Sequence, residues 1–160
     1  MTIAVVGIGQ SMRGDDAVGL EAVRLWQERH AKTAAGDGIR VETIQEPGVE
    51  LLDVLEHSDA ALIVDAVRSG APPGTLHNVD DARLSELERS SRSAHSLGVA
   101  DVLRLGTALS MIPGGCRVKL LGIEAEQVDL GAGLSTHVKE ALAAACEAIE
   151  REVQGLLIRS

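Results

Sequence analysis

Two aspartates and a histidine, Asp16, Asp65 and His95, have side chains that bind metals or transfer protons and lie beside predicted strands and helices. Asp16 follows Asp15, and two carboxylates before a helix either cap its free amide groups or bind a cation. Asp65 ends an apolar run, where its carboxylate either binds backbone amides of the next loop or projects into a crevice. His95 lies in a polar loop, where a single histidine is usually only solvated. A structural and a functional role therefore stay open for each residue.

The segment 7–16 can be compared with two phosphate-binding loops. A dinucleotide-binding loop has the pattern G-x-G-x-x-G, but Met12 stands where the third glycine is needed. A P-loop continues with lysine after its last glycine, whereas Gly14 is followed by two aspartates that repel phosphate. A nucleotide- or anion-binding module without catalytic activity stays an alternative, with the aspartate pair as evidence against it.

Short apolar runs and amphipathic stretches alternate along the chain, which is typical of an α/β protein. The predicted strands are residues 3–6, 39–44, 60–64, 75–79 and 117–123, and the predicted helices are residues 18–28, 48–56, a short stretch opening at 80–81, 99–109 and a last helix from 136. Residues 32–38 and 88–96 are predicted loops. The alternation predicts one domain, residues 1–160, that forms a three-layer α/β/α sandwich around a five-stranded, mostly parallel sheet with 75–79 at an edge.

Ligands of such sheets bind beyond the carboxyl ends of the strands, so we expect Asp16, Asp65 and His95 to share one crevice there. The other histidines are predicted to be solvated, namely His30, His57, His77 and His137. Cys146 falls on the apolar stripe of the last helix and is predicted to be a core thiol.

Composition and charge limit the partners of the protein. The net charge of −9 repels nucleic acid and anionic membranes, and Trp26 is the single aromatic residue, so a base-stacking surface is not expected. Cys116 and Cys146 form no C-x-x-C pair, so a disulfide framework or a cysteine zinc site is not expected either. Without a leader or an apolar run of twenty residues, the sequence predicts a cytoplasmic protein.

Three segments at matching separations carry a family resemblance: G-I-G-Q-S-M-R-G-D-D-A-V-G at 7–19, A-L-I-V-D-A-V at 61–67 and S-A-H-S-L-G-V-A-D-V-L at 93–103. Together they resemble the hydrogenase maturation endopeptidases, which trim the C-terminus of the large subunit of nickel-iron hydrogenases. The resemblance implies a mixed sheet with one antiparallel strand, and it implies that Asp16, Asp65 and His95 contact nickel. Departures from the family pattern occur at Gln10, at Ala17 and in the segment 45–48.

The same resemblance implies that nickel arrives bound in the precursor large subunit, so the metal acts as a recognition element and not as a resident cofactor. Two carboxylates and one imidazole form an incomplete ligand set, which leaves positions open for a shared metal. The sequence has neither a Ser/His/Asp pattern nor H-E-x-x-H, which favours a water nucleophile activated by metal or by a carboxylate. The resemblance implies an endopeptidase of the aspartyl type, and we expect it to be a monomer. An adaptor that docks on the hydrogenase without cutting it remains an alternative.

Overall fold

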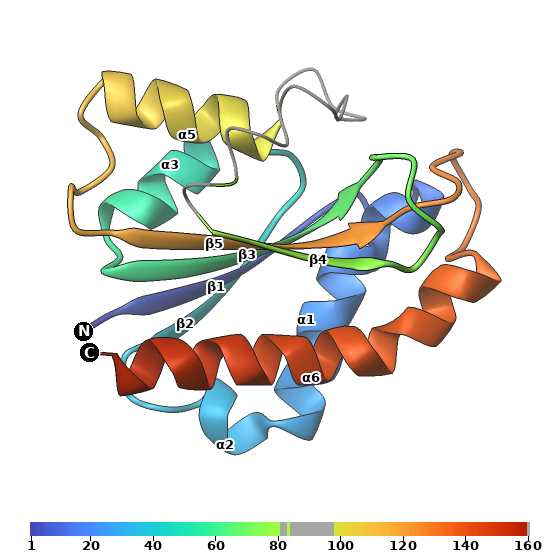
Figure 1. Cartoon of the computed structure of the whole chain (residues 1–160), viewed down its shortest axis with the longest axis horizontal. Coiled ribbons are helices and arrows are strands. Elements are labelled where there is room, and N and C mark those ends of the chain that lie inside the picture. The colour runs from blue at the N-terminus through green and yellow to red at the C-terminus, as the bar shows by residue number, and fades with distance from the viewer. Residues whose placement is uncertain (81–82, 84–97, 160) are drawn as a thin grey trace.

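A computed structural model describes residues 1–80, 83 and 98–159 and contains a five-stranded mixed sheet (Figure 1). The strand order is β2-β1-β3-β5-β4, and all neighbours are parallel except β4 and β5. The strands are β1 (Ile3–Ile8), β2 (Ile39–Ile44), β3 (Ala60–Val67), β4 (Leu76–Asp80) and β5 (Arg117–Glu124). The predicted α/β sandwich and the edge position of β4 are confirmed.

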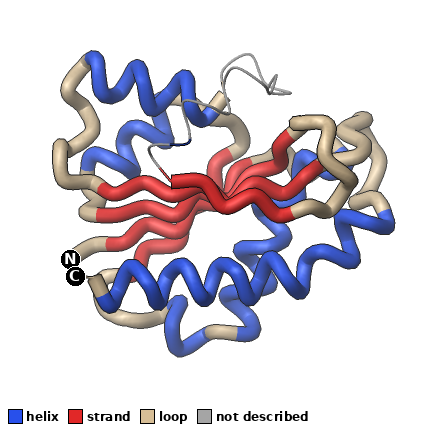
Figure 2. The backbone as a smooth tube through the Cα atoms, viewed as in Figure 1, coloured by secondary structure: helices blue, strands red, loops and turns tan. Residues whose placement is uncertain are grey.

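Helices cover both faces of the sheet (Figures 1 and 2). One face carries α1 (Val18–Arg29) and α6 (Thr136–Ile158), and the other carries α3 (Val49–Glu56) and α5 (Val99–Ala108). A short helix, α2 (Ala31–Ala34), follows α1, and a single 3-10 turn, η1 (Gly14–Ala17), precedes it. None of the described helices is long and apolar enough to cross a lipid bilayer.

The residues of β1 explain why the sheet is covered on both sides. All six are buried, and successive side chains of a strand point to opposite faces. Ala4, Val6 and Ile8 therefore join the core under α3 and α5, while Val5 joins the core under α1 and α6. A continuous apolar run is the expected pattern for a parallel strand between two helical layers.

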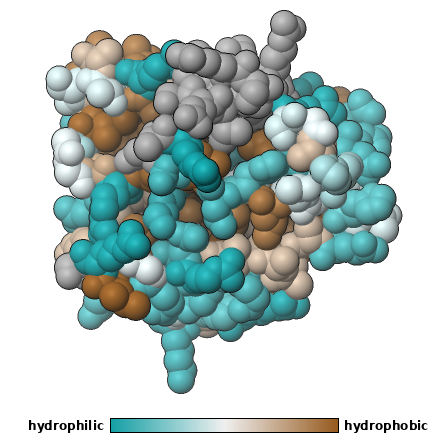
Figure 3. All heavy atoms as spheres, in the orientation of Figure 1, coloured by the Kyte–Doolittle hydropathy of each residue, from teal (hydrophilic) through white to brown (hydrophobic). Residues whose placement is uncertain are grey.

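The last helix is amphipathic, as its sequence predicts. Val138, Ala145, Ile149 and Val153 are buried on its inner stripe, and Cys146 is also fully buried, which confirms the prediction of a core thiol. Figure 3 shows mainly hydrophilic side chains over the part of the surface where α6 lies in Figure 1. The helix thus closes one side of the domain and presents its polar side to solvent.

Several predicted boundaries differ from the structure by one or more residues, and two of them have a clear physical reason. The predicted loop 32–38 begins inside α2, because the chain makes one more helical turn after His30 and packs Ala34 on the core. The third strand was expected to end before Asp65, but β3 continues to Val67 because β5 offers pairing partners as far as Glu124. The prediction that a short helix opens at 80–81 is wrong for Asp80, which is the last residue of β4 because it pairs with Lys119 of β5. The predicted loop 88–96 lies outside the described part of the chain.

Candidate functional site

The first loop of the chain folds back on the helical turn that carries Asp16. Gly9 has a φ of 154°, and a Cβ atom there would lie 2.0 Å from the carbonyl oxygen of Asp16. Only glycine permits this backbone conformation and this close approach. The position of η1 against the end of β1 therefore depends on Gly9.

A second glycine sets the start of α1 directly over two strands. A Cβ atom on Gly19 would lie 2.3 Å from the carbonyl oxygen of Val64 in β3 and 2.6 Å from that of Ile8 in β1. The turn η1, one helical turn earlier, also contacts β3. Asp16 in η1 and Asp65, the neighbour of Val64, consequently lie together at the edge of the sheet that is formed by the carboxyl ends of the parallel strands.

Backbone amides orient both carboxylates at this edge. Oδ2 of Asp16 accepts a hydrogen bond of 2.8 Å from the amide of Gln10, and Oδ1 of Asp65 accepts one of 2.8 Å from the amide of Ala66. Asp16 is 2% exposed and Asp65 is 6% exposed. The edge therefore presents two buried acidic side chains, each held in one orientation by its own loop or strand.

The third predicted ligand, His95, lies outside the described residues. Within residues 1–80, 83 and 98–159, the groups of three potential ligands close enough to share a metal do not include Asp16 or Asp65. The structure thus brings the two aspartates to one edge of the sheet, and the role of His95 stays a prediction.

Asp15 has a different function from that of its neighbour. Its fully buried carboxylate accepts hydrogen bonds from the amides of Glu126, Gln127 and Ser135 at 2.7–2.9 Å, and from the hydroxyl of Ser135 at 2.8 Å. Burial alone raises the pKa of Asp15, but these hydrogen bonds outweigh burial and place the pKa below its ordinary value. The prediction of a helix cap is wrong for Asp15, because its partners belong to the segment between β5 and α6.

A further buried carboxylate at the same end of the sheet was not predicted. Glu124, 2% exposed at the end of β5, accepts hydrogen bonds from the amide and hydroxyl of Ser69. Nε2 of His77 lies 3.1 Å from Glu124, so the prediction that His77 is solvated is wrong. The strand was predicted to end at residue 123, one residue before Glu124. A prediction that extended this buried strand by one residue would have included Glu124 and so indicated a buried carboxylate.

The remaining histidines divide into two groups. His137 and His57 are exposed, as predicted, although Nδ1 of His57 lies 2.9 Å from the carbonyl oxygen of Asp53. His30 contradicts the prediction, because its side chain is 24% exposed and its Nε2 lies 3.1 Å from Glu147 in α6.

A pocket of about 410 Å³ lies beside the loop that carries Asp16. It is lined by residues of that loop, of α1, of β2, of the segment between β2 and α3, and of α3 itself, namely Gly9, Ser11, Leu20, Thr43, Ile44, Gln45 and Glu50. Nε2 of Gln10 donates a hydrogen bond of 2.6 Å to Glu46. The two segments that depart from the family pattern thus contact each other beside this pocket.

The sequence and fold match known proteins along nearly the whole chain. The model of the HycI hydrogenase maturation protease family matches residues 47–152. Hydrogenase expression/formation protein HoxM of Azotobacter vinelandii is 30% identical over 142 residues, which are 88% of this chain and 66% of that protein. Hydrogenase 2 maturation protease of Escherichia coli is 28% identical over 150 residues, which are 93% of this chain and 88% of that protein.

The structure of the hydrogenase-maturating endopeptidase HybD from E. coli superimposes with a TM-score of 0.79 at 25% identity, over 97% of this chain and 93% of that chain. The chain spans just under two thirds of the length of the curated HoxM and HupD relatives, 66% and 64%. The family model covers well over half of this chain and includes Asp65. The chain therefore belongs to the hydrogenase maturation protease family.

Proposed function

We propose that the protein is an endopeptidase that removes a C-terminal peptide from the nickel-loaded precursor of a [NiFe] hydrogenase large subunit. Membership of the maturation protease family supports this reaction. The observation that carries the proposal is the position of Asp16 and Asp65, two buried carboxylates at one edge of the sheet, which Gly19 brings together by its close approach to β1 and β3.

In this proposal Asp16, Asp65 and His95 contact the nickel ion of the substrate. Carboxylate oxygens and an imidazole nitrogen are acceptable ligands for a divalent transition metal, and three protein ligands leave positions for the ligands of the precursor. The amides of Gln10 and Ala66 hold the carboxylates ready, so little reorganisation is needed when the loaded precursor docks. A precursor without nickel lacks this contact and is not cut.

Peptide hydrolysis then needs a water molecule placed against the scissile carbonyl. Water, activated by one of the carboxylates or by the metal of the substrate, adds to the carbonyl carbon, the carbon–nitrogen bond breaks, and the leaving amine takes up a proton. Asp16 and Asp65 are the described groups at this edge that we assign to binding and orientation. The protein acts as a cytoplasmic monomer in this proposal.

The test compares nickel-loaded and nickel-free precursor large subunit after incubation with the purified protein, with the products weighed by mass spectrometry. We expect only the loaded precursor to lose its C-terminal peptide. Stable binding of the loaded precursor without cleavage would instead identify an adaptor. Cleavage of both forms at equal rates would contradict recognition through nickel.

A further inference from the structure

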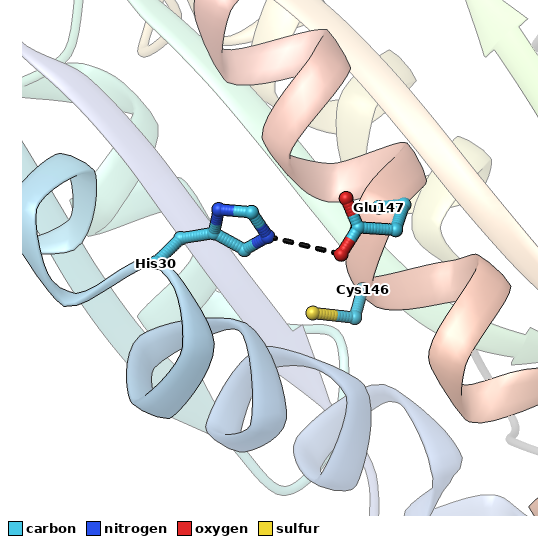
Figure 4. A group of neighbouring side chains, drawn as sticks. All are labelled: His30, Cys146 and Glu147. Atoms are coloured by element: carbon cyan, nitrogen blue, oxygen red, sulfur yellow. Dashed lines mark hydrogen bonds and ion pairs between the residues drawn. The ribbon is translucent and has the colours of Figure 1, made fainter.

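Three potential metal ligands of different chemistry meet where α1 passes into α2 beside α6. His30 follows the last residue of α1, and Cys146 and Glu147 are consecutive residues of α6. Nε2 of His30 lies 3.1 Å from Oε1 of Glu147, and the ligand atoms of all three residues lie within 4.8 Å of one another. Figure 4 shows the Cys146 sulfur, the imidazole and the carboxylate facing a common point.

The three side chains differ in exposure, so the site is closed on the side of Cys146 and open to solvent on the side of Glu147. Cys146 is fully buried, His30 is 24% exposed and Glu147 is 59% exposed. A metal ion can therefore enter past Glu147 and reach a sulfur that the apolar side chains of the core shield from water. A water molecule can complete a tetrahedral ligand set at the open side.

A second carboxylate lies near the other nitrogen of the His30 imidazole. Oε2 of Glu150 lies 3.7 Å from Nδ1 of His30, while Trp26 and Thr33 each donate a hydrogen bond of 2.8 Å to Glu150. Metal-binding histidines commonly face a carboxylate with the nitrogen that does not touch the metal, and this partner fixes the ring orientation. Glu150 thus occupies the position of such an orienting group.

The charges around the thiol favour a cation. Glu147 and Glu150 place two negative charges beside the imidazole and the thiol, and Arg29 opposes them with one positive charge. A divalent cation compensates the two carboxylates and stabilises the thiolate that forms when the thiol proton leaves to solvent.

We propose that His30, Cys146 and Glu147 form a binding site for a zinc-class divalent cation that ties the α1–α2 junction to α6. Nitrogen, sulfur and oxygen ligands together select borderline metals such as Zn²⁺ and Co²⁺ over Mg²⁺ and Ca²⁺. The site is distinct from the edge that carries Asp16, because the twelve residues of α1 separate the two by about 18 Å. The exposed group Asp53, Glu56 and His57 at the C-terminal end of α3 lacks a sulfur ligand and serves as an internal comparison.

Titration of the metal-free protein with Co²⁺, followed by absorption spectroscopy, tests the site, because cobalt bound to a thiolate gives an intense near-ultraviolet band. We expect this band in the wild-type protein and its loss in Cys146→Ser. His30→Gln and Glu147→Gln, at positions that tolerate polar side chains, should weaken Co²⁺ binding at least about tenfold while the band remains at saturation. Zn²⁺ at a hundredfold excess over its Kd should raise the melting temperature by about 5 °C in the wild type.

The controls separate this site from the other thiol and from the proposed nickel contacts. Cys116→Ser, His57→Ala and the double variant Asp16→Asn/Asp65→Asn should all retain the cobalt–thiolate band. A wild-type protein without the band, or a band lost in Cys116→Ser, would overturn the proposal and leave Cys146 as a core thiol only. Loss of the band in the double aspartate variant alone would also overturn it, by placing the metal at the other end of α1.

Discussion

Gln10 donates a hydrogen bond of 2.6 Å from its side-chain amide to Oε1 of Glu46, across 36 positions of sequence. This contact joins the loop that carries Asp16 to the segment between β2 and α3, and both partners belong to the departures from the family pattern. It also lies next to the pocket of about 410 Å³. We therefore expect the pair to influence which precursor is accepted, with little influence on folding.

Glu46→Ala tests this expectation. The hydrogen bond lies at the surface, so its loss should lower the free energy of unfolding by less than about 1 kcal/mol. The KM for the precursor should rise while kcat stays nearly unchanged, because loss of this side-chain hydrogen bond leaves the backbone amide of Gln10 bound to Asp16. Rates measured by mass spectrometry over a range of precursor concentrations separate the two constants. An unchanged KM would remove the pair from substrate recognition.

Substitution of either edge carboxylate should separate activity from stability. In Asp16→Asn and Asp65→Asn an amide oxygen can still accept the backbone hydrogen bond, so the melting temperature should stay close to that of the wild type. Cleavage of the loaded precursor should fall below about a hundredth of the wild-type rate, because the nickel contact is weakened. His95→Ala should behave in the same way. Full cleavage by any one of these variants would remove that residue from the proposed site.

Most helices and strands could be predicted from the sequence, because the pattern of apolar residues within each segment indicates its structure. The apolar run of β1 is buried on both sides, and the amphipathic stripe of α6 faces the core, so both patterns report burial directly. The end of β3 could not be located in this way. Its last residues are strand because β5 pairs with them, and strand pairing between distant segments leaves no mark on the local pattern.

The polar contacts were harder to predict for the same reason. Asp15 binds amides 111 to 120 positions away, and His30 faces Glu147 across 117 positions. An aspartate pair before a helix suggests a cap, and an isolated histidine suggests solvation, because neither pattern contains its distant partner. The residues at the sheet edge could be named only because the strand ends and the family resemblance agreed.

Nickel binding to the free protein should distinguish the two proposed metal sites. With only Asp16, Asp65 and His95 as ligands, the protein should bind Ni²⁺ weakly and reversibly at the sheet edge until a precursor adds its own ligands. Calorimetric titration of Cys146→Ser with Ni²⁺ isolates this site, and Asp16→Asn in that background should abolish the remaining heat. Persistence of the binding after both substitutions would show that nickel binds elsewhere.

Asp15 should matter for stability more than any other residue of its loop. Replacement by Ala removes the fully buried carboxylate that accepts from the amides of Glu126, Gln127 and Ser135, and hydrogen bonds to a charged group contribute about 1.5–3 kcal/mol each. We expect Asp15→Ala to lower the free energy of unfolding by about 3 kcal/mol or more in urea denaturation. Asp129→Ala, an exposed aspartate of the same segment, should change it by less than about 0.5 kcal/mol.

The same carboxylate should make stability depend on acid. The pKa of Asp15 is lower in the folded protein than in the unfolded chain, so the unfolded state takes up a proton first as the pH falls. Its contribution is complete above the unfolded pKa of about 3.9 and is lost as the pH falls from there toward the lower folded value. Between about pH 5 and pH 3 the wild type should therefore lose more stability than Asp15→Asn, which cannot titrate at this position. Urea denaturation of both proteins across this range measures the difference, and parallel curves would show that Asp15 has the same pKa in the folded and unfolded states.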